Sequence, residues 1–189
     1  MMTAKATIPQ RTGPHIYVAC LASYNAGKLH GVWIDCTFGE DSIWEEIREM
    51  LRASPCPNVT VEHDGEQVPS AEEFAIHDHE NFEGYEVGEY ESIAKVAEVA
   101  EGIEKHGEAF AAFLGYDSYN KPEDFEDRYR GSFSSFRDFS DDYADECVLE
   151  GNKNEVLARY FDYEAFARDL EHDFLVIDGA TQVHVFDNN

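Results

Sequence analysis

The most constraining feature of the sequence is the segment of residues 62–91, which carries eleven carboxylates and neither lysine nor arginine. The gap in positive charge extends further, because the 42 residues from Ala53 to Ala94 contain no lysine or arginine. Apolar and aromatic residues recur between the acids, at Phe74, Ile76, Phe82, Tyr85, Val87 and Tyr90. A disordered acidic tail would lack such residues. The pattern therefore predicts a folded surface with a strong negative potential.

The rest of the chain also has more acidic than basic residues. Its 189 residues contain 40 acidic residues against 14 lysines and arginines, which gives a net charge of −26, while a hydrophobic fraction of 43% is typical of globular proteins. A charge of this size argues against nucleic acid and anionic membranes as partners. The four cysteines have no metal-ligand spacing, and we expect reduced thiols. The N-terminus has no signal core and the longest apolar run, residues 16–22, cannot span a bilayer, so we expect a cytoplasmic protein.

The predicted elements belong to the α+β class, with strands at both ends of the chain and helices in the middle. In the first half we predict strands over residues 16–21 and 31–35 joined by a loop, a helix that begins at the capping box Ser42-x-x-Glu45, a strand over residues 71–77, and a helix capped by Ser92. In the second half we predict short helices over residues 107–114 and from residue 120, a helical segment opened by Ser135, a helix over residues 160–170 capped by Asp162, and a hairpin of residues 174–177 and 183–186. Residues 1–14 are expected to be loose.

These elements suggest a chain of about three small domains. The expected division is an N-terminal α+β domain over residues 15–70, a central acidic and mainly helical domain over residues 71–119, and a C-terminal α+β domain over residues 120–189.

The carboxylates are too numerous for any pair of them to indicate an acid–base enzyme.

Few motifs in the sequence indicate a metal site, a cofactor site or a catalytic site. On a regular strand His77 and His79 would lie on the same side, but no third histidine or cysteine follows at ligand spacing. The acidic run from Asp138 to Glu146 lacks the calcium-loop pattern, and no phosphate-binding or nucleophile motif occurs. We therefore expect no catalytic residue, no metal and no cofactor.

The charge itself leaves three interpretations open. Duplex DNA carries one negative charge per ~1.7 Å of axis, so the net charge of the chain corresponds to ~44 Å of duplex. Such a surface could imitate DNA, bind another basic protein such as a histone, or serve only to solvate the protein in a salt-rich cytoplasm. The uneven distribution of the acids favours a partner over solvation.

Three collinear motifs narrow this choice. They are YVACLASYNAGKLHGVWID at residues 17–35, AEEFAIHD at residues 71–78, and YFDYEAFARDL at residues 160–170, followed by VHVF at residues 183–186. Together they resemble the ArdA family of antirestriction proteins from Ile16 to Phe186, with Phe74 where tryptophan is expected and with a longer N-terminus.

The resemblance implies an elongated homodimer, carried by mobile genetic elements, whose carboxylates imitate the phosphates of bent DNA. Such a protein occupies the DNA-binding groove of type I restriction–modification enzymes, and so blocks restriction and, where the same groove serves methylation, modification. The C-terminal domain would supply the dimer contact. The carboxylates predicted to bind the partner are Glu62, Asp64, Glu66, Glu72, Glu73, Asp78, Glu80, Glu83, Glu86, Glu89, Glu91, Asp138, Asp141, Asp142, Asp145, Glu146 and Glu150.

Overall fold

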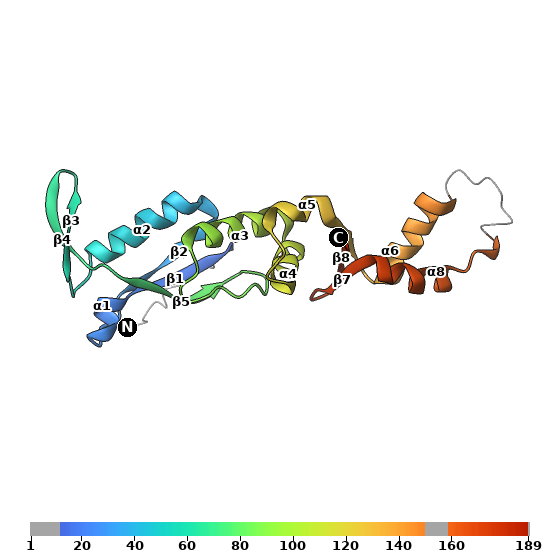
Figure 1. Cartoon of the computed structure of the whole chain (residues 1–189). Coiled ribbons are helices and arrows are strands. Elements are labelled where there is room, and N and C mark those ends of the chain that lie inside the picture. Colours follow the sequence, from blue (N-terminus) through green and yellow to red (C-terminus); the bar gives the residue numbers. More distant parts are fainter. Residues whose placement is uncertain (1–11, 150–158, 189) are drawn as a thin grey trace, which may run out of the picture. The chain divides into compact units, whose positions relative to one another are not determined.

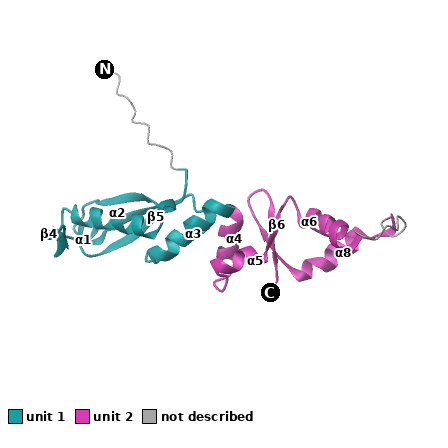
Figure 2. Ribbon diagram, turned by 90° about the horizontal axis from the view of Figure 1, so that it is seen from above, with its two compact units in different colours: residues 1–107 teal, residues 108–189 magenta. Residues whose placement is uncertain are grey.

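The structure is a computed structural model that describes residues 12–149 and 159–188 (Figure 1). It divides into two compact units, residues 1–107 and residues 108–189 (Figure 2). Strands occur toward both ends of the chain with helices between them, which confirms the α+β class. The finer division into three domains, with boundaries after residues 70 and 119, stays a prediction.

Unit 1 is built on an antiparallel sheet in the order β2-β1-β5. The central strand is made of alternating apolar residues, of which Ile16 and Val18 are fully buried. One irregularity interrupts its pairing with β5, where Tyr17 lies opposite Asp78 and Val18 opposite Ile76. Strand β5, which comes from the segment predicted to form a central domain, thus completes the N-terminal sheet. The strands are β1 (His15–Cys20), β2 (Gly31–Asp35) and β5 (Phe74–Glu80).

The connection between β1 and β2 is more ordered than predicted, because it includes the short helix α1 (Leu21–Asn25). After β2 a 3-10 turn, η1 (Cys36–Phe38), leads into α2 (Glu40–Arg52). The predicted start of α2 at Ser42 is wrong. Gly39 has a φ of 85°, which sets the helix boundary there, and two acids occupy the first turn, where the helix dipole favours negative charge.

A hairpin that the pattern analysis missed follows α2. Its strands are β3 (Val59–His63) and β4 (Glu66–Ser70), which pair antiparallel with each other as a two-stranded sheet. Asp64 and Gly65 form the turn with φ values of 51° and 81°, as a two-residue hairpin turn of type I′ requires. The sequence signal that could have predicted this hairpin is the Asp-Gly pair, which lies between two segments that contain valine.

Helix α3 (Ile93–His106) packs against α2 and η1. Ser92 caps it as predicted, because its side chain accepts a hydrogen bond from the Lys95 amide. The predicted apolar face is also confirmed, since its residues are all buried: Ile93, Val96, Ala97, Ala100 and Ile103.

Unit 2 has its own antiparallel sheet in the order β6-β8-β7. The predicted hairpin of β7 (Phe174–Asp178) and β8 (Val183–Asp187) is confirmed, whereas β6 (Tyr129–Phe133) was not predicted. An aromatic core includes Phe113, Phe125 and Phe186, whose ring centroids lie 4.9 to 5.7 Å apart. It joins the sheet to α4 (Glu108–Tyr116) and to α5 (Phe125–Arg128), which follows the turn η2 (Pro122–Asp124).

The remaining helices of unit 2 begin where their caps predict. Ser135 caps α6 (Phe136–Tyr143), which continues as a π-helical turn, η3 (Ala144–Leu149). Asp162 caps α8 (Tyr163–Leu170), which is followed by the turn η4 (Glu171–Asp173). Helix α6 packs against α8, and Phe139 of α6 is buried against Phe174 at 4.9 Å between ring centroids.

Candidate functional site

The predicted carboxylates of unit 1 lie on three consecutive parts of the chain. The end of the β3–β4 hairpin carries the first group, β5 and the residues before it carry the second, and the loop of residues 81–91 carries the third. All are exposed except Glu91, which is half-buried. In order along the chain they are Glu62, Asp64, Glu66, Glu72, Glu73, Asp78, Glu80, Glu83, Glu86, Glu89 and Glu91.

The hairpin turn presents its acids outward. Asp64 occupies the first turn position, and its side chain is 91% exposed. The positive φ at Gly65 is tolerated there because glycine has no Cβ. The narrow turn therefore holds Glu62, Asp64 and Glu66 on a defined backbone.

The loop of residues 81–91 is anchored to β5 at two points. Phe82 is only 2% exposed, and the Ile76 amide donates a hydrogen bond to the Glu89 carbonyl oxygen at 2.9 Å. Asn81 and Glu83 have positive φ values of 62° and 51°, which residues other than glycine rarely adopt. Packing and hydrogen bonding impose this path, so the loop carboxylates project from an ordered backbone.

Two tyrosines lie among these carboxylates, and both have a raised pKa. The pKa of the Tyr90 hydroxyl is raised, first by its hydrogen bond to Glu89 and then by the charges of Glu89 and Glu73. The pKa of Tyr85 is raised chiefly by burial, with a contribution from Glu91. Tyr90 is 74% exposed, so it projects from the surface, whereas Phe82 of the same aromatic pattern is buried.

The ion pairs recorded for these carboxylates involve histidine. His63 lies 3.6 Å from Asp64, and His79 lies 3.9 Å from Glu86. Both pairs carry opposite charges only when the imidazole is protonated. Residues 53–94 contain no lysine or arginine, so the permanently charged side chains of that stretch are all negative.

A second group of predicted carboxylates lies in unit 2 on α6 and η3. Asp141 is half-buried and accepts a hydrogen bond from Arg137 Nε at 2.6 Å. Asp145 accepts one from the Tyr163 hydroxyl at 2.5 Å, which raises the pKa of Tyr163. The exposed members are Asp138, Asp142, Asp145 and Glu146, whereas Glu150 lies outside the described residues.

Helix α2 carries an acidic face that was not among the predicted carboxylates. Asp41, Glu45 and Glu49 recur every four residues and are all exposed. On the same helix the pKa of Glu46 is raised, mainly by burial and then by the charges of Glu49 and Asp35. The helical spacing of these acids was the signal that could have identified them.

The two histidines of β5 contact different aromatic rings. His77 contacts the ring of Tyr24, with centroids 5.0 Å apart, whereas His79 contacts Phe82 at 5.7 Å. The bulge leaves His77 without an opposite residue on β1, so the regular strand assumed for the pair is absent. Within residues 12–149 and 159–188, no three His, Cys, Asp or Glu side chains are grouped to hold a metal ion. The helices of those residues also include none long and apolar enough to cross a membrane.

The fold and the site define an α+β protein with a concentrated anionic surface. The family model described as antirestriction protein (ArdA) matches residues 16–182, so the chain belongs to the ArdA family. A comparison with curated proteins gave no match. Membership of the family gives the chain an antirestriction function, and with it an interaction with restriction enzymes.

Proposed function

We propose that this protein is a DNA mimic that occupies the DNA-binding groove of type I restriction–modification enzymes. Occupation of the groove would block restriction and, where the same groove serves methylation, modification. The proposal makes the protein a stoichiometric inhibitor with no catalytic residue, metal or cofactor. Its place of action is the cytoplasm, where restriction enzymes meet incoming DNA, and a mobile element would gain from carrying it.

The single observation that supports this proposal most is the ordered loop of residues 81–91. It presents Glu83, Glu86 and Glu89 from a backbone fixed by Phe82 and by the Ile76–Glu89 hydrogen bond. Solvation requires charge but no fixed geometry, whereas imitation of regularly spaced phosphates requires both. The fixed path of the loop therefore favours mimicry over solvation.

We further propose a homodimer formed through the C-terminal part of the chain. Large side chains of unit 2 are exposed, including Tyr116 at 58%, Tyr119 at 86% and Tyr160 at 78%. Aromatic side chains are enriched at protein–protein interfaces. Analytical ultracentrifugation tests this part of the proposal directly.

The mimicry proposal is tested by two triple variants with the same change in net charge. The first neutralises loop carboxylates as Glu83→Gln, Glu86→Gln and Glu89→Gln. The second removes acids that already pair with a cation, as Glu98→Gln, Glu101→Gln and Asp169→Asn. Their partners are Lys95 at 3.5 Å, Lys105 at 2.7 Å and Arg168 at 3.7 Å.

Inhibition of a type I enzyme should weaken about tenfold with the first variant, if each exposed ion pair with the enzyme contributes about 0.5 kcal/mol. The second variant should weaken it much less, because its acids are already paired. A single change such as Glu73→Gln should be nearly silent, since the binding energy is distributed. Equal losses from the two triple variants would mean that net charge alone matters, and would refute the mimicry proposal.

A further inference from the structure

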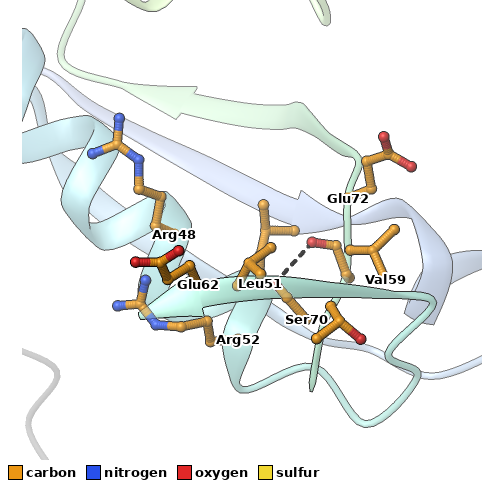
Figure 3. Close-up of a pocket in the computed structure, with 10 residues that line it drawn as sticks. Arg48, Leu51, Arg52, Val59, Glu62, Ser70 and Glu72 are labelled. Carbon is orange, nitrogen blue, oxygen red and sulfur yellow. Dashed lines mark hydrogen bonds between the residues drawn. The ribbon is translucent and has the colours of Figure 1, made fainter. Parts of the chain in front are cut away.

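A groove of about 530 Å³ lies between the end of α2 and the β3–β4 hairpin (Figure 3). One wall is formed by Arg48, Leu51 and Arg52 of α2. The other includes residues 59–62, four consecutive residues of β3, so the strand presents its backbone as well as its side chains to the groove. Glu62 and Glu72 of this groove belong to the carboxylates of the proposed function, whereas its arginines and the backbone of β3 have no role in it.

The backbone of β3 has an open hydrogen-bonding edge. Thr60 lies opposite Pro69 in the hairpin. Because proline has no N–H, Thr60 and Pro69 form a non-hydrogen-bonded pair of the antiparallel ladder. By the alternation of an antiparallel ladder, the N–H and C=O groups of Thr60 and Glu62 point away from β4. Both residues line the groove. On the opposite edge Pro69 removes a donor, which is a common protection against strand addition. β3 has no proline.

The arginines of the groove have no carboxylate partner among the described residues. In the described part of the chain neither Arg48 nor Arg52 has a carboxylate within ion-pair distance, whereas Lys95 and Lys105 of the same unit each pair with a glutamate. Arg48 lies over the ring of Trp44, with 5.8 Å from its guanidinium carbon to the ring centroid, and Arg52 is half-buried. Two guanidinium groups one helical turn apart, without a carboxylate partner among the described residues, match a carboxylate.

The groove offers a modest apolar contact beside these polar groups. Leu51 is 9% exposed, and Val59 and Val61 are half-buried. A two-stranded hairpin is marginally stable in water, so an added strand would stabilise it. Glu62 and Glu72 also line the groove and would disfavour acids placed next to them.

We propose that this groove binds an extended segment of a partner protein, which adds to β3 as a third strand and places one acidic side chain against Arg48 and Arg52. Main-chain hydrogen bonds to Thr60 and Glu62 would provide affinity, and the arginines would select the acid. The occupant is a partner rather than a second copy of this chain, because β3 of another copy would bring Glu62 and Asp64 toward the same acids. The site uses the two arginines and the backbone of β3, which have no role in the proposed function, although Glu62 and Glu72, which line it, belong to the phosphate-mimicking carboxylates.

The probe for this site is a capped peptide with a single glutamate, acetyl-TVEVTVT-amide, titrated into the full-length ¹⁵N-labelled protein and followed by NMR. The amide signals of Thr60 and Glu62 should shift, and their exchange with solvent should slow at least tenfold. A peptide with lysine in place of glutamate, and one with N-methylated amides on its hydrogen-bonding edge, should each bind at least tenfold more weakly.

Variants of the protein test the two contacts separately. Arg48→Gln with Arg52→Gln should weaken peptide binding about tenfold or more, whereas Lys105→Gln with Lys121→Gln removes the same charge elsewhere and should leave binding unchanged. Thr60→Pro removes an outward N–H and should abolish the backbone contact. The N-methylated peptide repeats that test without altering the protein.

Three results would overturn the proposal. They are the absence of shifts at Thr60 and Glu62 at millimolar peptide, equal binding of the lysine peptide, and protection of the two amides that rises with protein concentration alone. The last result would assign the edge to a second copy of the chain.

Discussion

Replacing Phe82 by alanine would displace the loop carboxylates without changing any charge. Phe82 is 2% exposed and contacts the ring of His79, and its carbonyl oxygen accepts a hydrogen bond from the Tyr85 amide at 2.9 Å. Truncating a buried phenylalanine to alanine costs about 3–5 kcal/mol. In a unit of this size, about 3 kcal/mol lowers Tm by roughly 12–24 °C. The loop should detach from β5 first, because it loses its buried aromatic contact and keeps the Ile76–Glu89 hydrogen bond and the exposed His79–Glu86 contact.

The consequence for inhibition follows from the number of displaced acids. Glu83, Glu86 and Glu89 project from this loop, and at about 0.5 kcal/mol for each exposed ion pair their misplacement costs about 1.5 kcal/mol of binding. That corresponds to about tenfold weaker inhibition. Thermal melting by circular dichroism gives the stability, and competition with fluorescent duplex DNA for a type I methyltransferase gives the affinity.

Phe186→Ala is the matched control, because Phe186 is fully buried in unit 2 and leaves the loop in place. It should lose comparable stability and keep its affinity at a temperature where it is folded. The reasoning is refuted if Phe82→Ala loses the expected stability but inhibits as well as the unaltered protein.

Three further predictions concern local contacts. Ser92→Ala should destabilise unit 1 by about 1 kcal/mol in urea unfolding, because it removes the cap of α3, and an unchanged midpoint would contradict this. Burial lowers the pKa of His184, although Glu108 at 3.6 Å opposes the shift, so folding favours the neutral imidazole. Stability from this residue should be complete above its ordinary pKa of 6.5 and decline as the pH falls below it, and Tm of His184→Gln should depend less on pH between 5 and 8. Cys147 is exposed, whereas burial raises the pKa of Cys36 to about 12. A thiol reagent at pH 8 should therefore label Cys147 quickly and Cys36 only on unfolding, and mass spectrometry of the labelled peptides would show this.

Local signals predicted the parts of the fold that local interactions determine. The caps at Ser92, Ser135 and Asp162 are correct because each side chain bonds to an amide three residues away. The start of α2 was wrong because Ser42 satisfied a capping pattern while the positive φ at Gly39 set the boundary. No local pattern could identify β6, since it is a short strand containing Gly131 whose partner β8 lies more than fifty residues later.

The candidate site was predicted in composition but not in arrangement. An acid outside a buried stripe is expected to be exposed, and the structure agrees for most of the predicted residues. The pattern did not show that Asp141 is held by Arg137 or that Tyr90 points into solvent, because these depend on neighbours brought close by the fold. It also gave no indication of the groove beside Arg48 and Arg52, which exists only because the hairpin folds next to the end of α2.

The central claim is that the acidic surface takes the place of DNA on the enzyme. The most direct measurement is to titrate this protein into a preformed complex of a type I methyltransferase with its duplex, and to count the species by native mass spectrometry. The account predicts that DNA leaves as the protein binds, near stoichiometry, and that no species contains all three components. A stable ternary complex of enzyme, duplex and inhibitor would contradict it.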